Sequence, residues 1–190
     1  MKRKIQAENT RQKLIDAAET LSKQKLLKDI TVDDITTLAK VAKGSFYTYF
    51  KKKEDVLDAF MFKDFEILRN KALTSKKDFS QRLEEYAIEF GKAIEKSGKE
   101  TCRSWVCANI NNDIKLNYDE KTAIMLLEDA DLKGELLKDG NILDMAKSFN
   151  AWLYGMMLVW AMRQGDDSLS ADIKSNIQEL KEVLKCKNVS

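Results

Sequence analysis

The stretch "SFYTYFKKKED" (residues 45–55) brings together side chains that could bind a polyanion. Ser, Thr and Tyr hydroxyls hydrogen-bond to base edges or phosphate oxygens, and lysine ammonium groups neutralise phosphates. The same residues also fit an ordinary helix with a buried aromatic side and a solvated lysine-rich end. The two interpretations differ in whether Tyr47 and Thr48 face outward.

Catalytic and metal-binding chemistry is poorly supported. Histidine is absent from the 190 residues, which removes the commonest general base and the commonest metal ligand. The three cysteines, Cys102, Cys107 and Cys186, have no disulfide-framework spacing, and an odd number of cysteines fits a reducing compartment. We therefore expect no enzymatic activity, no catalytic residues, no metal and no cofactor.

Charge is distributed unevenly along the chain. Residues 1–53 carry 13 Lys and Arg against 6 Asp and Glu, a formal charge of +7, whereas residues 54–190 carry 20 against 25, a formal charge of −5. A basic N-terminal quarter on an acidic remainder is typical of a protein whose one end meets nucleic acid. A lysine-rich solvated face would give the same balance, so charge alone does not decide between them.

The composition favours an all-α fold. The chain has no proline and seven glycines, and it is rich in the helix formers Lys, Glu, Leu and Ala. No apolar run approaches the roughly 20 residues that span a bilayer, and the basic N-terminus lacks the apolar region of a signal peptide. We expect a cytoplasmic protein with no membrane partner.

Helix signals predict two helices before residue 41, of which the second is short. The first begins at a predicted N-cap, Thr10, and buries a stripe spaced i, i+3, i+4, i+7: Leu14, Ala17, Ala18 and Leu21. An acidic capping box opens the second, with Thr31 as N-cap and Asp34 three residues later. The second helix ends near Lys40, and its predicted buried residues are Val32, Ile35, Leu38 and Ala39.

A third helix, from about Lys43 to Tyr49, would carry the hydroxyl and aromatic residues. Phe46 and Phe50 are four residues apart, so both face the first two helices. The opposite face then carries Gly44, Ser45, Tyr47, Thr48 and Lys51. A short capped helix, a tight turn and a second short helix with an exposed polar face are typical of a helix-turn-helix.

Residues 31–57, "TVDDITTLAKVAKGSFYTYFKKKEDVL", resemble the DNA-binding signature of the TetR-family transcriptional repressors. The matches, which need no gap, are Ile35, Ala39, Val41, Lys43, Gly44, Phe46, Tyr47, Tyr49, Phe50, Lys53, Glu54 and Leu57. "RQKLIDAAETL" (11–21) is similar to the family's first helix. Lys40 replaces the family's usual turn glycine, and a left-handed lysine there would cost about 1–2 kcal/mol.

The resemblance implies that the third helix enters the major groove of double-stranded DNA. The residues that we then assign to DNA contact are Thr31, Lys43, Gly44, Ser45, Tyr47, Thr48, Tyr49 and Lys53. Ser45 and Thr48 suit base edges, the tyrosine hydroxyls suit phosphate oxygens, and Lys53 matches the family's phosphate-binding lysine. Residues 2–4, which are Lys, Arg and Lys, could form a flexible arm into the flanking groove.

Residues 54–190 are predicted to be helical throughout. The expected helices span residues 54–75, 78–96, 101–110, 120–137, 142–163 and 169–185. The segment 142–163 is apolar on more than one face, so it needs a second surface besides its own bundle. It is also similar to the family's dimerisation helices, which implies a homodimer on a palindromic operator.

Methionine and aromatic residues concentrate in this bundle, which suits an adaptable apolar pocket as well as an ordinary core. The resemblance implies a small-molecule site in the bundle. The candidate ligand-binding residues are Tyr86, Phe90, Trp105, Asn109 and Tyr154. The implied effector is small and apolar or aromatic.

Together these patterns predict an all-α protein with an N-terminal three-helix helix-turn-helix domain, residues 1–53, and a larger helical effector-binding and dimerisation bundle, residues 54–190. The predicted function is DNA-binding transcriptional regulation by a repressor. Effector binding would release it from its operator, with the helix that starts at Glu54 as the lever. Two alternatives stay open: a helical protein-interaction module with a basic end, and a DNA-binding regulator without an effector.

Overall fold

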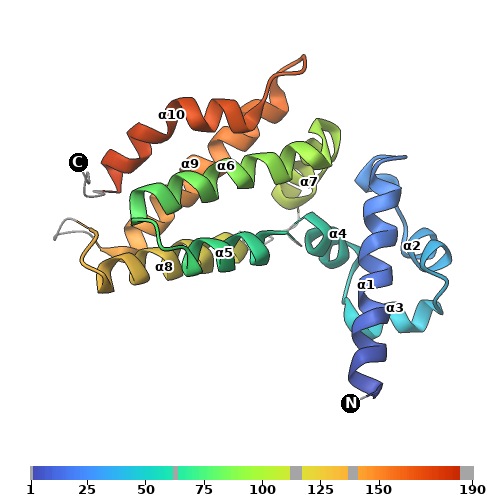
Figure 1. The fold of residues 1–190 in the computed structure, drawn as a ribbon. Helices are drawn as coiled ribbons and strands as arrows, with labels where there is room; N and C mark the ends of the chain where they lie inside the picture. Colours follow the sequence, from blue (N-terminus) through green and yellow to red (C-terminus); the bar gives the residue numbers. More distant parts are fainter. Residues whose placement is uncertain (1, 62–63, 112–116, 137–140, 185–190) are drawn as a thin grey trace. The chain divides into compact units, whose positions relative to one another are not determined.

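The computed structural model describes residues 2–61, 64–111, 117–136 and 141–184 (Figure 1). Within these ranges the chain consists of α-helices, a short 3₁₀ helix (η1) and connecting loops, as the composition predicts. The elements are α1 (Lys2–Ser22), η1 (Leu27–Asp29), α2 (Val32–Ala39), α3 (Lys43–Tyr49), α4 (Lys53–Met61), α5 (Phe65–Thr74), α6 (Phe79–Ser97), α7 (Lys99–Asn111), α8 (Asn117–Leu132), α9 (Ile142–Met162) and α10 (Leu169–Val183).

The chain divides into two compact units. Unit 1 comprises residues 1–63 together with 100–112, and unit 2 comprises residues 64–99 together with 113–190. α4 therefore belongs to the same unit as α1, α2 and α3. α7 also belongs to unit 1, although α6 and α8, which flank it in sequence, belong to unit 2. The functional boundary between residues 53 and 54 stays a prediction.

Unit 1 forms around α1, which packs against α2 and α4 (Figure 1). Its predicted apolar stripe is buried, apart from half-buried Leu21. The helix begins at Lys2, and the Thr10 hydroxyl, in the middle of α1, donates to Gln6 O at 2.9 Å. The predicted N-cap at Thr10 is therefore wrong, and residues 2–4 continue α1 instead of forming an arm.

The fourth helix is shorter than predicted. The sequence predicts one helix over 54–75, whereas α4 ends at Met61, Asp64 lies in a turn, and α5 begins at Phe65. Leu57, Met61 and Phe65 continue an i, i+4 spacing across the break. Because the apolar periodicity is not interrupted there, it could not reveal that the helix ends.

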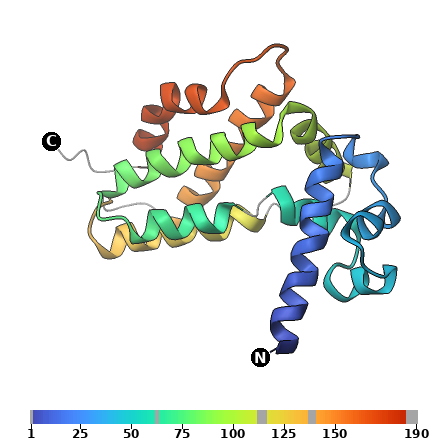
Figure 2. The ribbon, with the colours of Figure 1, turned by 45° about the vertical axis from the view of Figure 1, so that its right-hand side comes forward.

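In unit 2, α6 lies alongside α5 and α10, and α8 packs on α9 (Figure 1 and Figure 2). The bounds of α6, α9 and α10 agree with the prediction to within two residues, whereas α8 ends at Leu132, earlier than expected. Gly91 of α6 allows a close approach to α10, because a Cβ at this position would lie 3.0 Å from Ser170 Cα.

Candidate nucleic-acid interface

Thr31 and Asp34 form the predicted capping box at the start of α2. The Asp34 amide donates to Thr31 Oγ1 at 3.1 Å, and Asp34 Oδ2 accepts from the Thr31 amide at 2.8 Å and from its hydroxyl at 2.7 Å. Lys25 Nζ lies 2.6 Å from the same carboxylate oxygen. The Lys25 bond, followed by the Thr31 bonds, holds the pKa of Asp34 well below its ordinary value. The Thr31 hydroxyl proton is thus engaged within the cap.

Lys40 ends α2 in the left-handed conformation, with φ 56° and ψ 46°. Its amide donates to Thr37 O at 3.2 Å and the Val41 amide donates to Thr36 O at 3.0 Å, the hydrogen-bond pattern of a Schellman motif. Among the described residues, Lys40 alone combines a side chain with a positive φ. The turn therefore keeps the geometry that favours glycine, at a strain of about 1–2 kcal/mol.

Two phenylalanines anchor α3, whose bounds agree with the prediction. Phe46 is 0 % exposed and Phe50 is 5 % exposed, with ring centroids 5.6 Å apart. Arg11 of α1 lies over the Phe50 ring, its Cζ 5.4 Å from the centroid, in a cation–π contact. Because the anchors lie one turn apart, they fix which side of α3 is covered.

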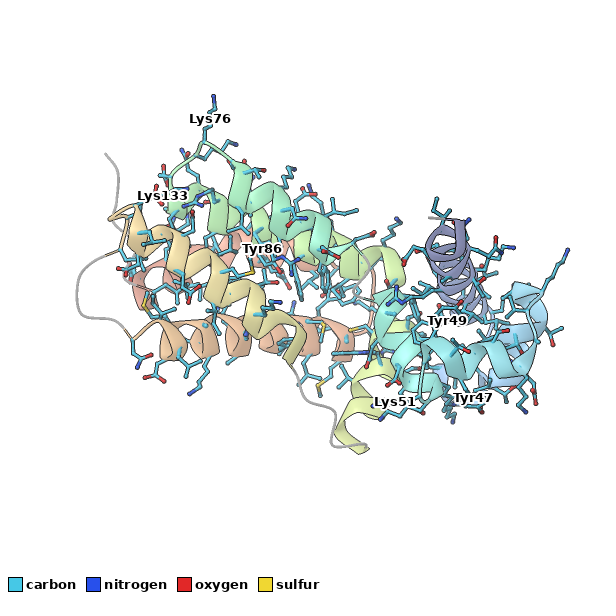
Figure 3. The ribbon with its side chains drawn as sticks, turned by 90° about the horizontal axis from the view of Figure 1, so that it is seen from below. Tyr47, Tyr49, Lys51, Lys76, Tyr86 and Lys133 are labelled. Carbon is cyan, nitrogen blue, oxygen red and sulfur yellow. The ribbon has the colours of Figure 1, made fainter. Side chains whose placement is uncertain are left out.

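The outward side of α3 presents the predicted polar and aromatic residues. Gly44, Tyr47 and Thr48 are exposed, and Ser45 and Tyr49 are half-buried. The Tyr47 side chain is 55 % exposed. Figure 3 shows Tyr47 and Tyr49 on α3 with Lys51 just beyond it. The interpretation in which Tyr47 and Thr48 belong to the core is therefore wrong.

Lysines flank this side of α3. Lys43 Nζ lies 2.8 Å from Asp33 Oδ1 of α2, and both side chains are more than half exposed. An exposed pair of this kind contributes little to stability, so a phosphate could replace Asp33 at little cost. The amides of Lys51 and Lys52 donate to Asp55 Oδ2 at 2.9 and 3.2 Å, which fixes the connection from α3 to α4.

One predicted core residue of α2 lies outside. Leu38 is 45 % exposed, whereas Thr36 is buried and donates its hydroxyl to Val32 O at 3.0 Å. The eight-residue helix packs on α1 and α3 and buries only one side. Thr36 can occupy that side because its hydroxyl is satisfied within the helix. The prediction that Leu38 is a core residue is wrong.

Lys53 begins α4 and uses its ammonium group inside unit 1. Its Nζ donates to Lys28 O at 2.8 Å, to Ile30 O at 2.9 Å and to Leu27 O at 3.3 Å. Sequence reasoning missed this arrangement, because the carbonyls lie more than 20 residues before Lys53 and no local pattern links them. The assignment of Lys53 to a DNA phosphate stays a prediction.

Three of the predicted ligand-binding residues lie in unit 2. Tyr86 and Phe90 are buried on α6, and Tyr154 is half-buried on α9. The ring centroids of Phe90 and Tyr154 lie 6.4 Å apart, and Tyr86 packs against Phe149 at 6.0 Å. Figure 3 shows Tyr86 among the helices of this unit. These residues form part of an aromatic core.

The other two predicted ligand-binding residues lie on α7, in unit 1. Trp105 is buried, and its Nε1 donates to Asp58 Oδ1 of α4 at 2.7 Å. Burial raises the pKa of Asp58, although the Trp105 bond opposes the shift. The side chain of Asn109 lies outside the described residues. Trp105 thus links α7 to α4 within unit 1.

Cavities occur in both units. In unit 1, a cavity of about 280 Å³ lies where α1 ends and α7 begins, lined by residues 22–27 with Glu100, Thr101 and Ser104. In unit 2, a cavity of about 40 Å³ lies between α5 and α6, with Tyr86 in its lining. The larger cavity is lined mostly by polar residues and contains none of the predicted ligand-binding side chains.

A buried arginine ties α6 to the end of α8. Arg82 is fully buried, and its Nη1 and Nη2 donate to Asp129 Oδ2 at 2.5 Å and Glu135 Oε2 at 2.6 Å. The partners lie 47 and 53 residues away in the sequence, so no spacing pattern could have predicted them. The two carboxylates neutralise the buried guanidinium, so the arrangement has a structural role.

The described part of the chain has no group of three His, Cys, Asp or Glu residues that could hold a metal ion. Burial raises the pKa of the Cys102 thiol to about 12, whereas Cys107 is exposed. Cys186 lies outside the described residues. Within the same ranges, the helices are too short or too polar to cross a membrane.

Residues 14–60 match the family model described as "Bacterial regulatory proteins, tetR family". A comparison with curated proteins gave no match. Among solved structures, Thermus thermophilus FadR, a TetR-family transcriptional repressor in complex with lauroyl-CoA, is similar over 94 % of this chain and 97 % of its own, at 18 % identity and a TM-score of 0.73. A TetR transcriptional regulator from Rhodococcus sp. RHA1 is similar over 96 % of this chain and 98 % of its own, at 14 % identity and a TM-score of 0.70. SmeT in complex with triclosan is similar over 94 % and 92 %, at 18 % identity and a TM-score of 0.64.

The family match covers the parts of unit 1 that carry the predicted chemistry. Residues 14–60 include the capping box, the turn at Lys40, all of α3 and almost all of α4. The likeness to the solved structures, at identities below 25 %, concerns the fold and extends over nearly the whole chain. Residues 14–60 thus match the family of bacterial tetR regulatory proteins, and nearly the whole chain has the fold of the solved TetR-family regulators.

Proposed function

We propose that the chain represses transcription as a homodimer on a palindromic double-stranded DNA operator, and that a small apolar or aromatic effector releases it. The outward presentation of α3 carries this proposal. Phe46 and Phe50 hold one side of the helix in the core, which leaves Tyr47 and Thr48 available to the major groove. Because the partner is operator DNA, we also propose a cytoplasmic location.

DNA contacts are assigned by side-chain chemistry. The proposed contact residues are Thr31, Lys43, Gly44, Ser45, Tyr47, Thr48 and Tyr49. Ser45 and Thr48 suit base edges or a thymine methyl group, and the tyrosine hydroxyls suit phosphate oxygens. Lys43 would exchange the exposed Asp33 carboxylate for a phosphate when DNA binds.

Gly44 allows folding and DNA binding to be separated. A Cβ built on Gly44 meets no heavy atom within 4 Å, so the protein's own packing does not require glycine at this position. Gly44→Ala should keep or raise the free energy of unfolding, by up to about 1 kcal/mol from helix propensity. The added methyl group should nevertheless lower DNA affinity, because it keeps the α3 backbone away from the duplex.

The measurement pairs urea unfolding with fluorescence anisotropy on an operator selected from random DNA. If the Gly44→Ala variant binds DNA with unchanged affinity, the proposed close approach of the α3 backbone to the duplex is contradicted. In the same selection, Thr48→Ala should change the preferred base at one position of each half-site, and an unchanged motif would contradict a base contact by Thr48. A basic protein-interaction module would select no motif at all.

The homodimer is proposed from an exposed apolar stripe on α9. Leu158, Val159 and Met162 are 40, 48 and 72 % exposed, and Ala151 and Gly155 are exposed one to two turns earlier. These positions share one side of the helix. A second copy of the same stripe would cover it, because a two-fold interface places the same surface on both subunits. Gly155, with open space around it, would allow close approach of the partner.

Val159→Glu tests the dimer. A charge in the middle of the stripe should dissociate the dimer and abolish binding to a two-half-site operator, because a buried unpaired carboxylate is costly. Ile67→Glu on α5 is the matched control, since Ile67 is 67 % exposed and lies in another helix. Light scattering after gel filtration gives the mass, and a Val159→Glu variant that stays dimeric would contradict this interface.

The effector is proposed from the aromatic residues of unit 2. FadR of Thermus thermophilus was solved with lauroyl-CoA and SmeT with triclosan, and both share this fold. We place a comparable apolar or aromatic ligand beside Tyr86, Phe90 and Tyr154. Thermal unfolding with a panel of acyl and aromatic compounds should find one that raises Tm and lowers operator affinity. A panel without such a compound would favour a regulator that has no effector.

The switch is proposed to run from α6 to α4 through α7. α6 ends at Ser97 and α7 begins at Lys99, so a shift of α6 reaches α7 through one residue. The hydrogen bond from Trp105 Nε1 to Asp58 Oδ1, 2.7 Å long, would then transmit the movement of α7 to α4. Trp105→Phe, which lacks the donor, should weaken effector-induced release. Asp58→Asn keeps an acceptor and serves as the control, and equal release by both variants would exclude this route.

A further inference from the structure

We propose that Lys53 is a positioning residue, whose ammonium group holds the helix-turn-helix in place and does not contact a DNA phosphate. The proposal rests on the proposed function only in taking α3 as the DNA-reading helix. It replaces the role that the family resemblance gives to Lys53, and it follows from the hydrogen-bond partners of this side chain.

The donors of Lys53 are fully used inside the protein. Nζ lies 2.8 Å from Lys28 O, 2.9 Å from Ile30 O and 3.3 Å from Leu27 O. An ammonium group has three N–H donors and no acceptor. Three carbonyl partners therefore leave no N–H for a phosphate unless one of these bonds breaks.

The carbonyls are held in place by the core of unit 1. Leu27 is 2 % exposed and Ile30 is 0 % exposed, so their side chains anchor the segment that includes η1. Turning its carbonyls toward DNA or water would pull two core residues out of place. Lys53 is itself half-buried, and hydrogen bonds with a charged donor are stronger than neutral ones.

The bonds of Lys53 close one end of the segment that contains α2 and α3. Ile30 directly precedes Thr31, the N-cap of α2, so fixing Ile30 fixes where α2 begins. At the other end, Asp55 in the first turn of α4 accepts the Lys51 and Lys52 amides. The first turn of α4 thus holds both ends of the helix-turn-helix, and Lys53 supplies the bonds to its beginning.

The experiment compares Lys53→Met with Lys43→Met and Lys52→Met. We measure the urea midpoint of each variant, and the operator affinity over a range of salt concentrations. Lys53→Met should lower the midpoint and weaken DNA binding equally at every salt concentration, so that the slope of log K against log[salt] stays unchanged. Lys43→Met should keep the midpoint and flatten the slope by about 0.9 for each phosphate that the lysine neutralises in the parent complex. Lys52→Met, an exposed neighbour, should keep the midpoint.

Lys53→Arg distinguishes the two roles of this side chain. A phosphate contact survives replacement of lysine by arginine, whereas a planar guanidinium cannot direct three N–H groups to these carbonyls. We expect Lys53→Arg to lower the midpoint and to increase hydrogen exchange of the α2 and α3 amides. This milder variant also provides the measurement if Lys53→Met does not fold.

Two results would overturn the proposal. One is a flattened salt slope with an unchanged midpoint in Lys53→Met, which is the behaviour of a phosphate-binding lysine. The other is a lowered midpoint with unchanged DNA affinity, since α3 would then bind its site without this clamp. If the parent chain binds no DNA, the proposed function fails, and the midpoints and hydrogen exchange still test whether Lys53 holds the segment.

Discussion

Replacing Lys40 by glycine should stabilise unit 1. The left-handed conformation, with φ 56° and ψ 46°, costs a residue with a Cβ about 1–2 kcal/mol, and glycine avoids this cost. Glycine also lowers the free energy of unfolding by roughly 0.5–1 kcal/mol, because it makes the unfolded chain more flexible. The net gain in the free energy of unfolding should be about 0.7 kcal/mol, which corresponds to a rise of about 0.4 M in the urea midpoint for an m-value of about 2 kcal/mol/M.

The assay is urea unfolding followed by circular dichroism, with Lys40→Ala and Lys40→Asn as controls. Lys40→Ala removes the same charge but keeps the Cβ, so it should gain nothing. Lys40→Asn should fall between the two, because asparagine tolerates the left-handed region better than alanine. Equal midpoints for the Gly and Ala variants would refute the strain at this turn, since both lose the lysine side chain.

Three further predictions concern charged groups in the two units. Arg82→Ala should lower the free energy of unfolding by about 3–5 kcal/mol, because it leaves its carboxylate partners without their buried cation; a decrease below about 1 kcal/mol in urea unfolding would contradict this. The pKa of Asp58 is raised, chiefly by burial, so the folded chain holds the proton of this carboxyl more tightly than the unfolded chain does. The stability that the protonated carboxyl contributes is therefore lost as pH rises above 3.8. Asp58→Asn, which keeps an acceptor for Trp105, should therefore have a free energy of unfolding at pH 7 that equals or exceeds that of the parent. Any gain in stability should shrink toward pH 4. A variant that is less stable than the parent, and more so at pH 7 than at pH 4, would contradict this prediction. Asp34 has a lowered pKa, so its contribution is present above pH 3.8 and lost as pH falls further, and Asp34→Asn should flatten acid unfolding in that range.

Local signals predicted the helix-turn-helix correctly. The capping box of Thr31 and Asp34 forms within four residues, and the spacing of Phe46 and Phe50 sets the buried side of α3. Both depend on neighbours along the chain, so the sequence is sufficient to predict them. The same local rules failed at Thr10, where helical residues continue on both sides of a possible cap.

Apolar periodicity predicts that a helix has a covered side, but it does not say where a helix stops or how much of it is covered. The apolar spacing continues from α4 into α5, although these are two separate helices. It also predicted that Leu38 is buried, whereas α1 and α3 leave this side chain exposed. Both errors have the same cause. The packing of neighbouring helices decides burial and helix ends where propensity allows either outcome.

The sequence by itself determined the helical content, the family of residues 14–60 and the side of α3 that faces outward. Only the tertiary structure decided the partners of Lys53, Arg82 and Trp105, because each pairs with groups more than 20 residues away. A hydrogen bond between distant residues exists only after packed helices have brought donor and acceptor within about 3 Å. Side-chain type therefore predicts what a residue can bind, and packing decides which of its possible partners it meets.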